Sequence, residues 1–144
     1  MARTSAGSVR RKEHLVNHCR HLIFTTALPP AIGAWWRAAL PRVQSDDAGR
    51  RALHAAAEGF RAALARRGIA ALGQNYVVPI VLGNDDPAVR AAGALQEAGY
   101  DIRAIRPPSV PPGTARLRIS VHADHEPAML AALAEAVADV CIPS

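Results

Sequence analysis

The proline-rich segment at residues 105–120, which reads IRPPSVPPGTARLRIS, is the feature that most constrains how this chain can fold. Proline locks φ at about −65° and has no backbone N–H, so the segment can form neither the interior of a helix nor a central strand. We expect an extended, rigid loop that presents Arg106 and Ser109 and turns at Gly113. Its prolines are Pro107, Pro108, Pro111 and Pro112.

The residues that follow this loop alternate between polar and apolar side chains. Arg116 and Arg118 are expected on one face of a strand, while Leu117 and Ile119 point to the other face. This alternation is typical of a strand with one buried and one exposed face. An arginine on an exposed face suits a carboxylate ligand, because its planar guanidinium can donate two parallel hydrogen bonds.

Elsewhere, apolar residues recur at helical spacing, and short β-prone stretches lie between these helices. The expected helices cover residues 8–21, 29–40, 46–68, 84–99 and 124–140. Ser8 should cap the first, the second should stop before Pro41, and Asp46 or Asp47 should cap the third. The expected strands cover residues 22–26, 77–82, 100–105 and 116–121. This order predicts an α/β (α+β) fold in which a short, mostly antiparallel sheet is covered by helices.

Two helical faces can be assigned in more detail. The helix at residues 84–99 should turn Val89, Ala92 and Leu95 toward the core. Trp35 and Trp36 are adjacent in another helix, so they point about 100° apart, and at least one of them should face a neighbouring surface.

Composition and charge argue against several partners. The chain has 144 residues and a formal net charge of +5, from 17 basic and 12 acidic side chains. The arginines are dispersed among acidic residues, so we expect no nucleic-acid partner. No apolar stretch approaches the roughly 20 residues that span a bilayer, so no membrane partner is expected. Cys19 and Cys141 are far apart without zinc-ligand spacing, which is typical of free thiols in a cytoplasmic protein.

The histidines do not predict a metal centre. His14, His18 and His21 fall on one helical face at i, i+4 and i+7, but no glutamate base or supporting pattern accompanies them. His122 and His125 flank the start of the last helix, where we expect them to be turn or capping residues. The sequence therefore assigns no metal ligands.

Three segments resemble the PLP-dependent α-oxoamine synthases. RPPSVPPGTARLRI at residues 106–119 is similar to the C-terminal signature of that family, and HLIFTTALPP at 21–30 and VVPIVLG at 77–83 are similar to two further segments. They occur in family order with similar spacing, so the resemblance covers nearly the whole chain. It implies that residues 1–144 form a single domain like the C-terminal small domain of a fold type I PLP-dependent transferase, including the interdomain helices that precede it.

The resemblance also implies binding residues. Thr25 and Thr26 match a pair that reaches across a dimer to the PLP phosphate of the neighbouring subunit, and hydroxyls just before a helix N-terminus suit a phosphate. Ser109 takes the position of a substrate-contacting threonine. Arg118 matches the arginine that binds the carboxylate of the amino acid or product, whereas Arg116 is expected to be structural.

The implied reaction is a decarboxylative condensation. The proline-rich loop is most like that of the family members that join L-alanine to pimeloyl-CoA or pimeloyl-carrier protein in biotin biosynthesis. PLP chemistry needs a lysine that holds the cofactor as a Schiff base. Lys12 is the only lysine, and its context RRKEHL is not that of a cofactor lysine. We therefore assign no catalytic residue and expect the isolated chain to be inactive. As partner we expect a second copy in a homodimer, or a chain that carries the large, lysine-bearing domain.

Two alternatives stay open. Sister enzymes that make aminolevulinate, ketosphinganine or aminoketobutyrate share this resemblance, and the proline-rich loop only favours the pimeloyl reaction among them. The chain could instead be a non-catalytic interaction module that binds a full-length synthase through the face bearing Trp35 and Trp36. Co-purification with a synthase, without a gain in activity, would distinguish this module from an enzyme.

Overall fold

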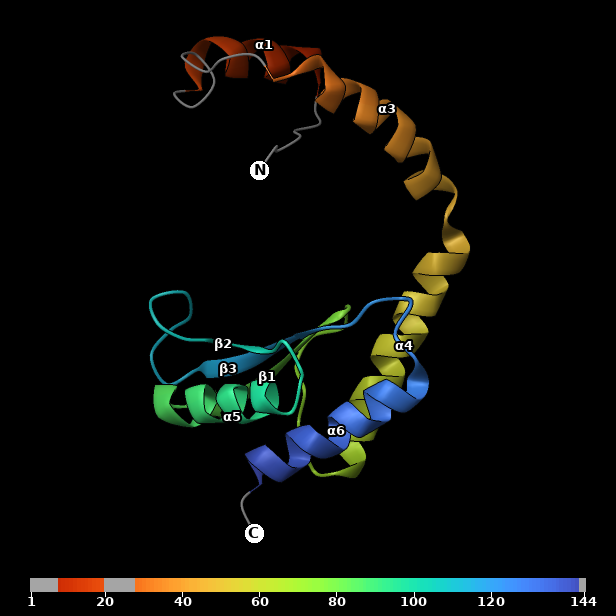
Figure 1. Cartoon of the computed structure of the whole chain (residues 1–144). Helices are drawn as coiled ribbons and strands as arrows, with labels where there is room; N and C mark the ends of the chain where they lie inside the picture. Colours follow the sequence, from red (N-terminus) through yellow and green to blue (C-terminus); the bar gives the residue numbers. More distant parts are fainter. Residues whose placement is uncertain (1–7, 20–27, 143–144) are drawn as a thin grey trace. The chain divides into compact units, whose positions relative to one another are not determined.

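The computed structural model describes residues 8–19 and 28–142. Contacts within the chain divide it into two units, residues 1–45 and residues 46–144 (Figure 1). The expectation that all 144 residues form one domain stays a prediction. Across the described ranges, none of the helices combines the length and the apolar character that crossing a membrane requires.

The described part of the first unit consists of two helices, α1 (Val9–His18) and α3 (Pro30–Ser45). Ser8 caps α1 as predicted, because its hydroxyl oxygen accepts a hydrogen bond from the backbone N–H of Arg11 at 3.4 Å. The strand predicted at residues 22–26 lies outside the described residues.

α3 continues past Pro41, so the prediction that it stops before this proline is wrong. Proline removes one intrahelical hydrogen bond, but its fixed φ of about −65° is itself a helical value. The helix therefore lacks a donor at Pro41 and still ends only at Ser45.

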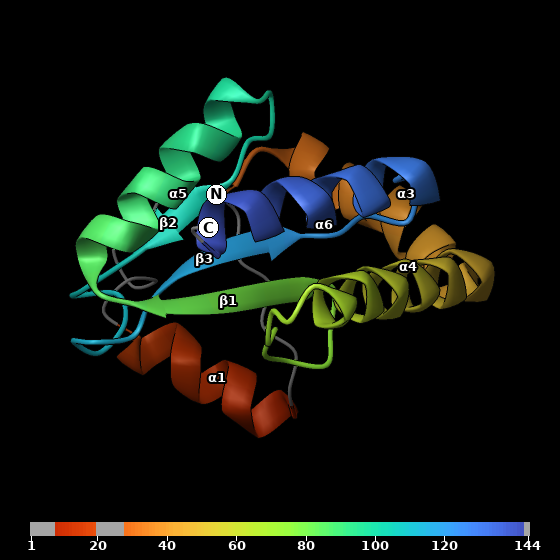
Figure 2. The same cartoon turned by 90° about the horizontal axis from the view of Figure 1, so that it is seen from below.

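The second unit contains a three-stranded antiparallel sheet in the order β1-β3-β2. Its elements are β1 (Val77–Gly83), β2 (Arg103–Ile105), β3 (Ala115–Ser120), α4 (Asp47–Arg66), α5 (Asp85–Glu97) and α6 (Pro127–Cys141). α5 packs against all three strands, and α6 lies between α5 and α4 (Figures 1 and 2). The predicted fold, a short antiparallel sheet covered by helices, is confirmed.

One face of this sheet lies in the core. In β3, Leu117 and Ile119 are buried and pair with Ile80 and Val78 of β1, which are buried as well. Because side chains alternate along a strand, Arg118 is left on the opposite, exposed face. The half-buried strand that the alternating sequence predicts is therefore confirmed.

The core-facing side of α5 differs from the prediction. Val89 is 46% exposed, so its assignment to the core is wrong. Each residue advances about 100° around a helix, and the buried set begins one position before Val89, which turns Val89 away from the sheet. The buried residues are Ala88, Ala91, Ala92 and Leu95.

β2 is shorter than the strand predicted at residues 100–105. The backbone N–H of Ile102 donates to the carbonyl of Tyr100 at 2.8 Å, which closes a tight turn before the strand begins. Only Arg103–Ile105 pairs with β3. The length of this strand depends on how far β3 runs beside it, which the strand preferences of its own residues do not predict.

The proline-rich loop between β2 and β3 is turned rather than extended. The backbone N–H of Ser109 donates to the carbonyl of Arg106 at 3.0 Å, and that of Thr114 donates to the carbonyl of Pro111 at 3.2 Å. The predicted extended loop is therefore wrong, because proline fixes φ but leaves ψ free to close a turn. Gly113 has a φ of +74°, which confirms the corner predicted there.

The outer edge of β1, on the side away from β3, is occupied by neighbouring groups. The carbonyl of Pro79 accepts a hydrogen bond from the N–H of Leu72 at 2.9 Å. The guanidinium of Arg61 in α4 donates to the carbonyls of Asn75 and Val77. Because the N and O atoms of one strand residue point to the same side, the nitrogen of Pro79 also faces outward, where a missing donor is tolerated.

Asp46 caps α4, so its removal should weaken the second unit. Its Oδ1 atom accepts a hydrogen bond from the backbone N–H of Gly49 at 2.8 Å. We expect Asp46→Ala to lower the free energy of unfolding by about 1 kcal/mol, because an N–H at the helix start loses its acceptor. Urea unfolding followed by circular dichroism measures this change. Asp46→Asn keeps a side-chain oxygen and should unfold close to wild type, whereas equal losses in both variants would contradict the capping role.

Candidate functional site

Three arginines share the exposed face of the sheet, and all three strands lie within the described residues. Arg118 lies between Pro79 of β1 and Arg103 of β2, and Arg116 lies opposite Ile105. Residues directly opposite each other in an antiparallel pair share a face, so Arg103 joins the two arginines that the sequence places there. Adjacent cations of this kind repel one another unless anions accompany them.

The three guanidiniums differ in their partners. Arg103 pairs with Asp101, and its Nε and Nη2 atoms each lie 2.9 Å from the same carboxylate oxygen. Arg116 donates from Nε to the carbonyl of Thr114 at 2.9 Å, which ties it to the end of the loop.

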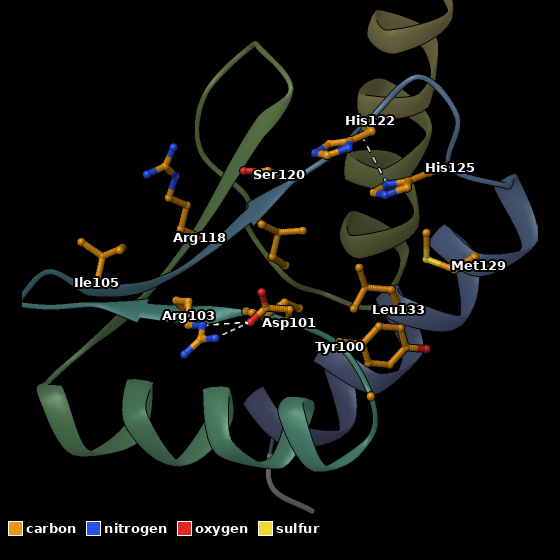
Figure 3. Close-up of a pocket in the computed structure, with 13 residues that line it drawn as sticks. Tyr100, Asp101, Arg103, Ile105, Arg118, Ser120, His122, His125, Met129 and Leu133 are labelled. Atoms are coloured by element: carbon orange, nitrogen blue, oxygen red, sulfur yellow. Dashed lines mark hydrogen bonds and ion pairs between the residues drawn. The ribbon is translucent and has the colours of Figure 1, made fainter. Parts of the chain in front are cut away.

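Arg118 is the arginine of this face that is available to a ligand. Within the described residues it forms no hydrogen bond or ion pair, and its side chain is exposed. It extends away from the pair formed by Arg103 and Asp101 (Figure 3). A carboxylate placed at Arg118 would gain charge-assisted hydrogen bonds without displacing an existing partner.

A groove of about 710 Å³ lies beside Arg118 (Figure 3). Its polar side chains come from the sheet and from the connection to α6, and they include Arg103, Arg118, Ser120, His122 and His125. Its apolar wall includes Ile105, Ile119, Met129 and Leu133. A groove with this lining can take a ligand that has a carboxylate at one end and an apolar body.

Ser109 lies apart from this groove. It is exposed in the loop that enters β3 at Ala115, and it is not among the residues that line the groove. Arg118 lies three positions further along β3, at a rise of about 10 Å. The structure therefore does not bring Ser109 and Arg118 into one pocket of this chain, and their shared substrate role stays a prediction.

The structure describes only some of the residues that the resemblance relates to the cofactor. Thr25 and Thr26 lie outside the described residues, so their contact with a phosphate stays a prediction. Lys12 is exposed on α1, and the second unit contains no lysine in its sequence. The groove residues thus suit an anionic group held by arginine, but they offer no amine for covalent attachment of an aldehyde.

Two features of this region were not predicted. The pairing of Arg103 with Arg118 follows from strand register, for which the only sequence signal is the alternation around each arginine. His122, Asp124 and His125 come together in one turn. Their spacing in the sequence, H-x-D-H, is the signal that could have indicated this cluster. His14 and His18 stack on α1 with ring centroids 4.2 Å apart, while His21 lies outside the described residues.

The chain belongs to the aminotransferase class I and II family, whose model matches residues 4–137. Among its relatives, the 8-amino-7-oxononanoate synthase of Chlorobaculum parvum is 45% identical over 113 residues, which cover 78% of this chain and 29% of that protein. The enzyme of the same name from Anaeromyxobacter dehalogenans (strain 2CP-C) is 44% identical over 135 residues, covering 90% and 34%. The chain thus spans about a third of the length of the curated relatives it matches.

Solved structures agree with this family. A serine palmitoyltransferase variant from S. paucimobilis, with bound PLP and myriocin, superposes with a TM-score of 0.81 at 26% identity, covering 89% of this chain and 33% of that one. An 8-amino-7-oxononanoate synthase from Francisella tularensis superposes with a TM-score of 0.78 at 22% identity, covering 91% and 38%. These likenesses confirm the predicted relation to the fold type I enzymes.

Proposed function

We propose that this chain is the C-terminal portion of a PLP-dependent acyltransferase that condenses L-alanine with a pimeloyl thioester, with loss of CO₂, to give 8-amino-7-oxononanoate. The observation that carries the proposal is the 45% identity with an enzyme of that name over 78% of the chain. The position of Arg118 supports it, because the reaction uses an amino acid whose carboxylate needs a cationic partner before it leaves.

In this proposal, the residues of this chain bind and orient rather than react. Arg118 holds the carboxylate of L-alanine or of the product, and the apolar wall of the groove beside it contacts the rest of the ligand. Ser109 contacts the substrate, and Thr25 with Thr26 contacts the phosphate of PLP across a subunit interface. PLP, when bound, supplies the electron sink that makes carbanion chemistry accessible. The lysine that holds it comes from a large domain that these 144 residues do not contain.

Reduction with borohydride tests where the cofactor lysine lies. The purified 144-residue chain is incubated with PLP, reduced, and searched for labelled lysine by mass spectrometry. We expect no stoichiometric label on Lys12, because its exposed position on α1 gives it no cofactor pocket. When the chain is combined with a polypeptide that carries the large domain, L-alanine and pimeloyl-CoA should yield 8-amino-7-oxononanoate. A stoichiometric label on Lys12, or a combined enzyme that uses only another amino acid, would contradict the proposal.

The exposed face of α3 favours a second candidate, the interaction module. Trp35 is 59% exposed and stacks edge-on against Trp36, with ring centroids 4.8 Å apart. Leu40 and Val43 are 47% and 61% exposed on the same helix. Aromatic and aliphatic side chains in this arrangement are typical of protein interfaces. Under this candidate, the chain would co-purify with a full-length synthase, activity would not rise, and Trp35→Ala would abolish the association.

A further inference from the structure

Two histidines and an aspartate meet in the connection between β3 and α6. One ligand atom from each of His122, Asp124 and His125 lies within 4.8 Å of the others. The backbone N–H of His125 contacts the carbonyl of His122 at 3.4 Å, which closes a turn from one histidine to the other. The two imidazole rings stack with centroids 4.9 Å apart (Figure 3).

The backbone on both sides of this turn is fixed by the core. Val121 is buried, and its N–H donates to the carbonyl of Tyr76 at 2.8 Å. Leu130 is buried in the first turns of α6. Because the chain is anchored immediately before and shortly after the turn, the three side chains stay close together without an added ligand.

We propose that His122, Asp124 and His125 form a binding site for a divalent transition metal ion such as Zn²⁺. Imidazole nitrogen and carboxylate oxygen are the usual protein ligands of Zn²⁺, whereas Mg²⁺ and Ca²⁺ prefer oxygen alone. Three protein ligands leave a coordination position for water or for a ligand in the groove, which His122 and His125 also line.

Binding requires only side-chain adjustment. Ligand atoms around a tetrahedral Zn²⁺ lie about 3.4 Å apart, so the present cluster must contract by a little more than 1 Å. His122 and Asp124 are exposed and His125 is half-buried, and the ring torsion of histidine is broad, so the parallel rings can rotate toward a shared ion. Nδ1 of His125 accepts a 3.3 Å hydrogen bond from the N–H of His122; binding through Nε2 would keep this bond.

Positive and negative charges around the three ligands roughly offset each other, so the surroundings do not by themselves attract a cation. The N-terminus of α6 disfavours a cation, and Arg66 and Arg118 line the grooves on either side of the cluster. The carboxylates of Asp124 and Glu126 offset these positive charges. We therefore expect selectivity for ions that bind imidazole strongly, because charge attraction alone would not retain Mg²⁺ or Ca²⁺ here.

The site can be tested on the full 144-residue chain without an affinity tag and without PLP, so the result does not depend on the proposed reaction. Zn²⁺ is titrated by calorimetry, and Co²⁺ is used to read the coordination geometry from its visible absorption. We expect saturable binding of one ion at this cluster, unaffected by excess Mg²⁺.

Variants locate the ion. His122→Ala and His125→Ala should each weaken Zn²⁺ binding by about tenfold or more, and Asp124→Asn should weaken it less, because the amide keeps one oxygen. His54→Ala, at an exposed site on α4, and His14→Ala, on α1, are the matched controls. Circular dichroism verifies that each variant is folded. The proposal is overturned if no saturable binding occurs, if His122→Ala and His125→Ala bind as wild type, or if His14→Ala alone abolishes binding.

Discussion

Replacing Phe60 with alanine is expected to lower the free energy of unfolding by about 3–5 kcal/mol. Phe60 is only 1% exposed, and it lies among the buried residues where α4 packs against α6. Truncation to alanine leaves a cavity and removes the transfer free energy of the ring, and neighbouring side chains can fill such a space only in part. Because domains are typically stable by about 5–15 kcal/mol, a loss of this size should move the unfolding transition to a clearly lower urea concentration.

Urea titration of the 144-residue chain, followed by circular dichroism, measures this loss. Val89→Ala is the matched control, because it also shortens an apolar helical side chain but at a position that is 46% exposed. It should change the free energy of unfolding by no more than about 0.5 kcal/mol. If both variants unfold at the same urea concentration, Phe60 does not stabilise the packing of α4 against α6.

Arg118→Lys is expected to reduce kcat/KM for L-alanine by about 10- to 100-fold in the enzyme reconstituted with the large domain. Lysine keeps the positive charge but cannot donate two parallel hydrogen bonds to one carboxylate. Hydrogen bonds to charged groups contribute about 1.5–3 kcal/mol, which corresponds to that range of rates. Steady-state kinetics with varied L-alanine measure the effect, and most of it should appear in KM if the contact holds the substrate in its ground state.

The control for this variant lies on the same face. Arg103→Lys removes a guanidinium directly opposite Arg118, but Arg103 already pairs with Asp101. We expect kcat/KM to stay within about twofold of wild type, because an exposed ion pair contributes only about 0–1 kcal/mol. Because both variants keep the positive charge, an equal loss in Arg103→Lys would mean that the guanidinium of Arg103 contributes as much to substrate binding as that of Arg118. An unchanged Arg118→Lys would exclude Arg118 from the carboxylate site.

Local signals in the sequence were sufficient for the caps of α1 and α4 and for the alternation of β3. Asp46 caps α4 because its side chain reaches the N–H of a residue three positions away. Arg118 is exposed and Leu117 is buried because successive side chains of a strand point to opposite faces. These features depend only on residues a few positions away, so they can be predicted from a single sequence.

Features that depend on residues far away in the sequence were harder to predict from the sequence alone. The start of β2 is set by its pairing with β3, and the same pairing places Arg103 opposite Arg118. The turns of the proline-rich loop depend on ψ, which proline does not fix. α3 passes through Pro41 because a helix can tolerate one missing donor, whereas the residue type alone indicated a stop. For the candidate site, the exposed position of Arg118 was predictable, but the groove beside it and the turn that gathers His122 with His125 were not.

The outer edge of β1 offers another chain very little to pair with. Pro79 has no donor, its carbonyl is already bonded to Leu72, and the carbonyl of Val77 lies within reach of Arg61. Edge strands that expose a full row of backbone groups recruit further strands and promote aggregation. The protein should therefore resist sheet growth across this edge even at high concentration. At this edge, association between copies is left to side-chain surfaces, which can be selected for specificity in a way that bare backbone cannot.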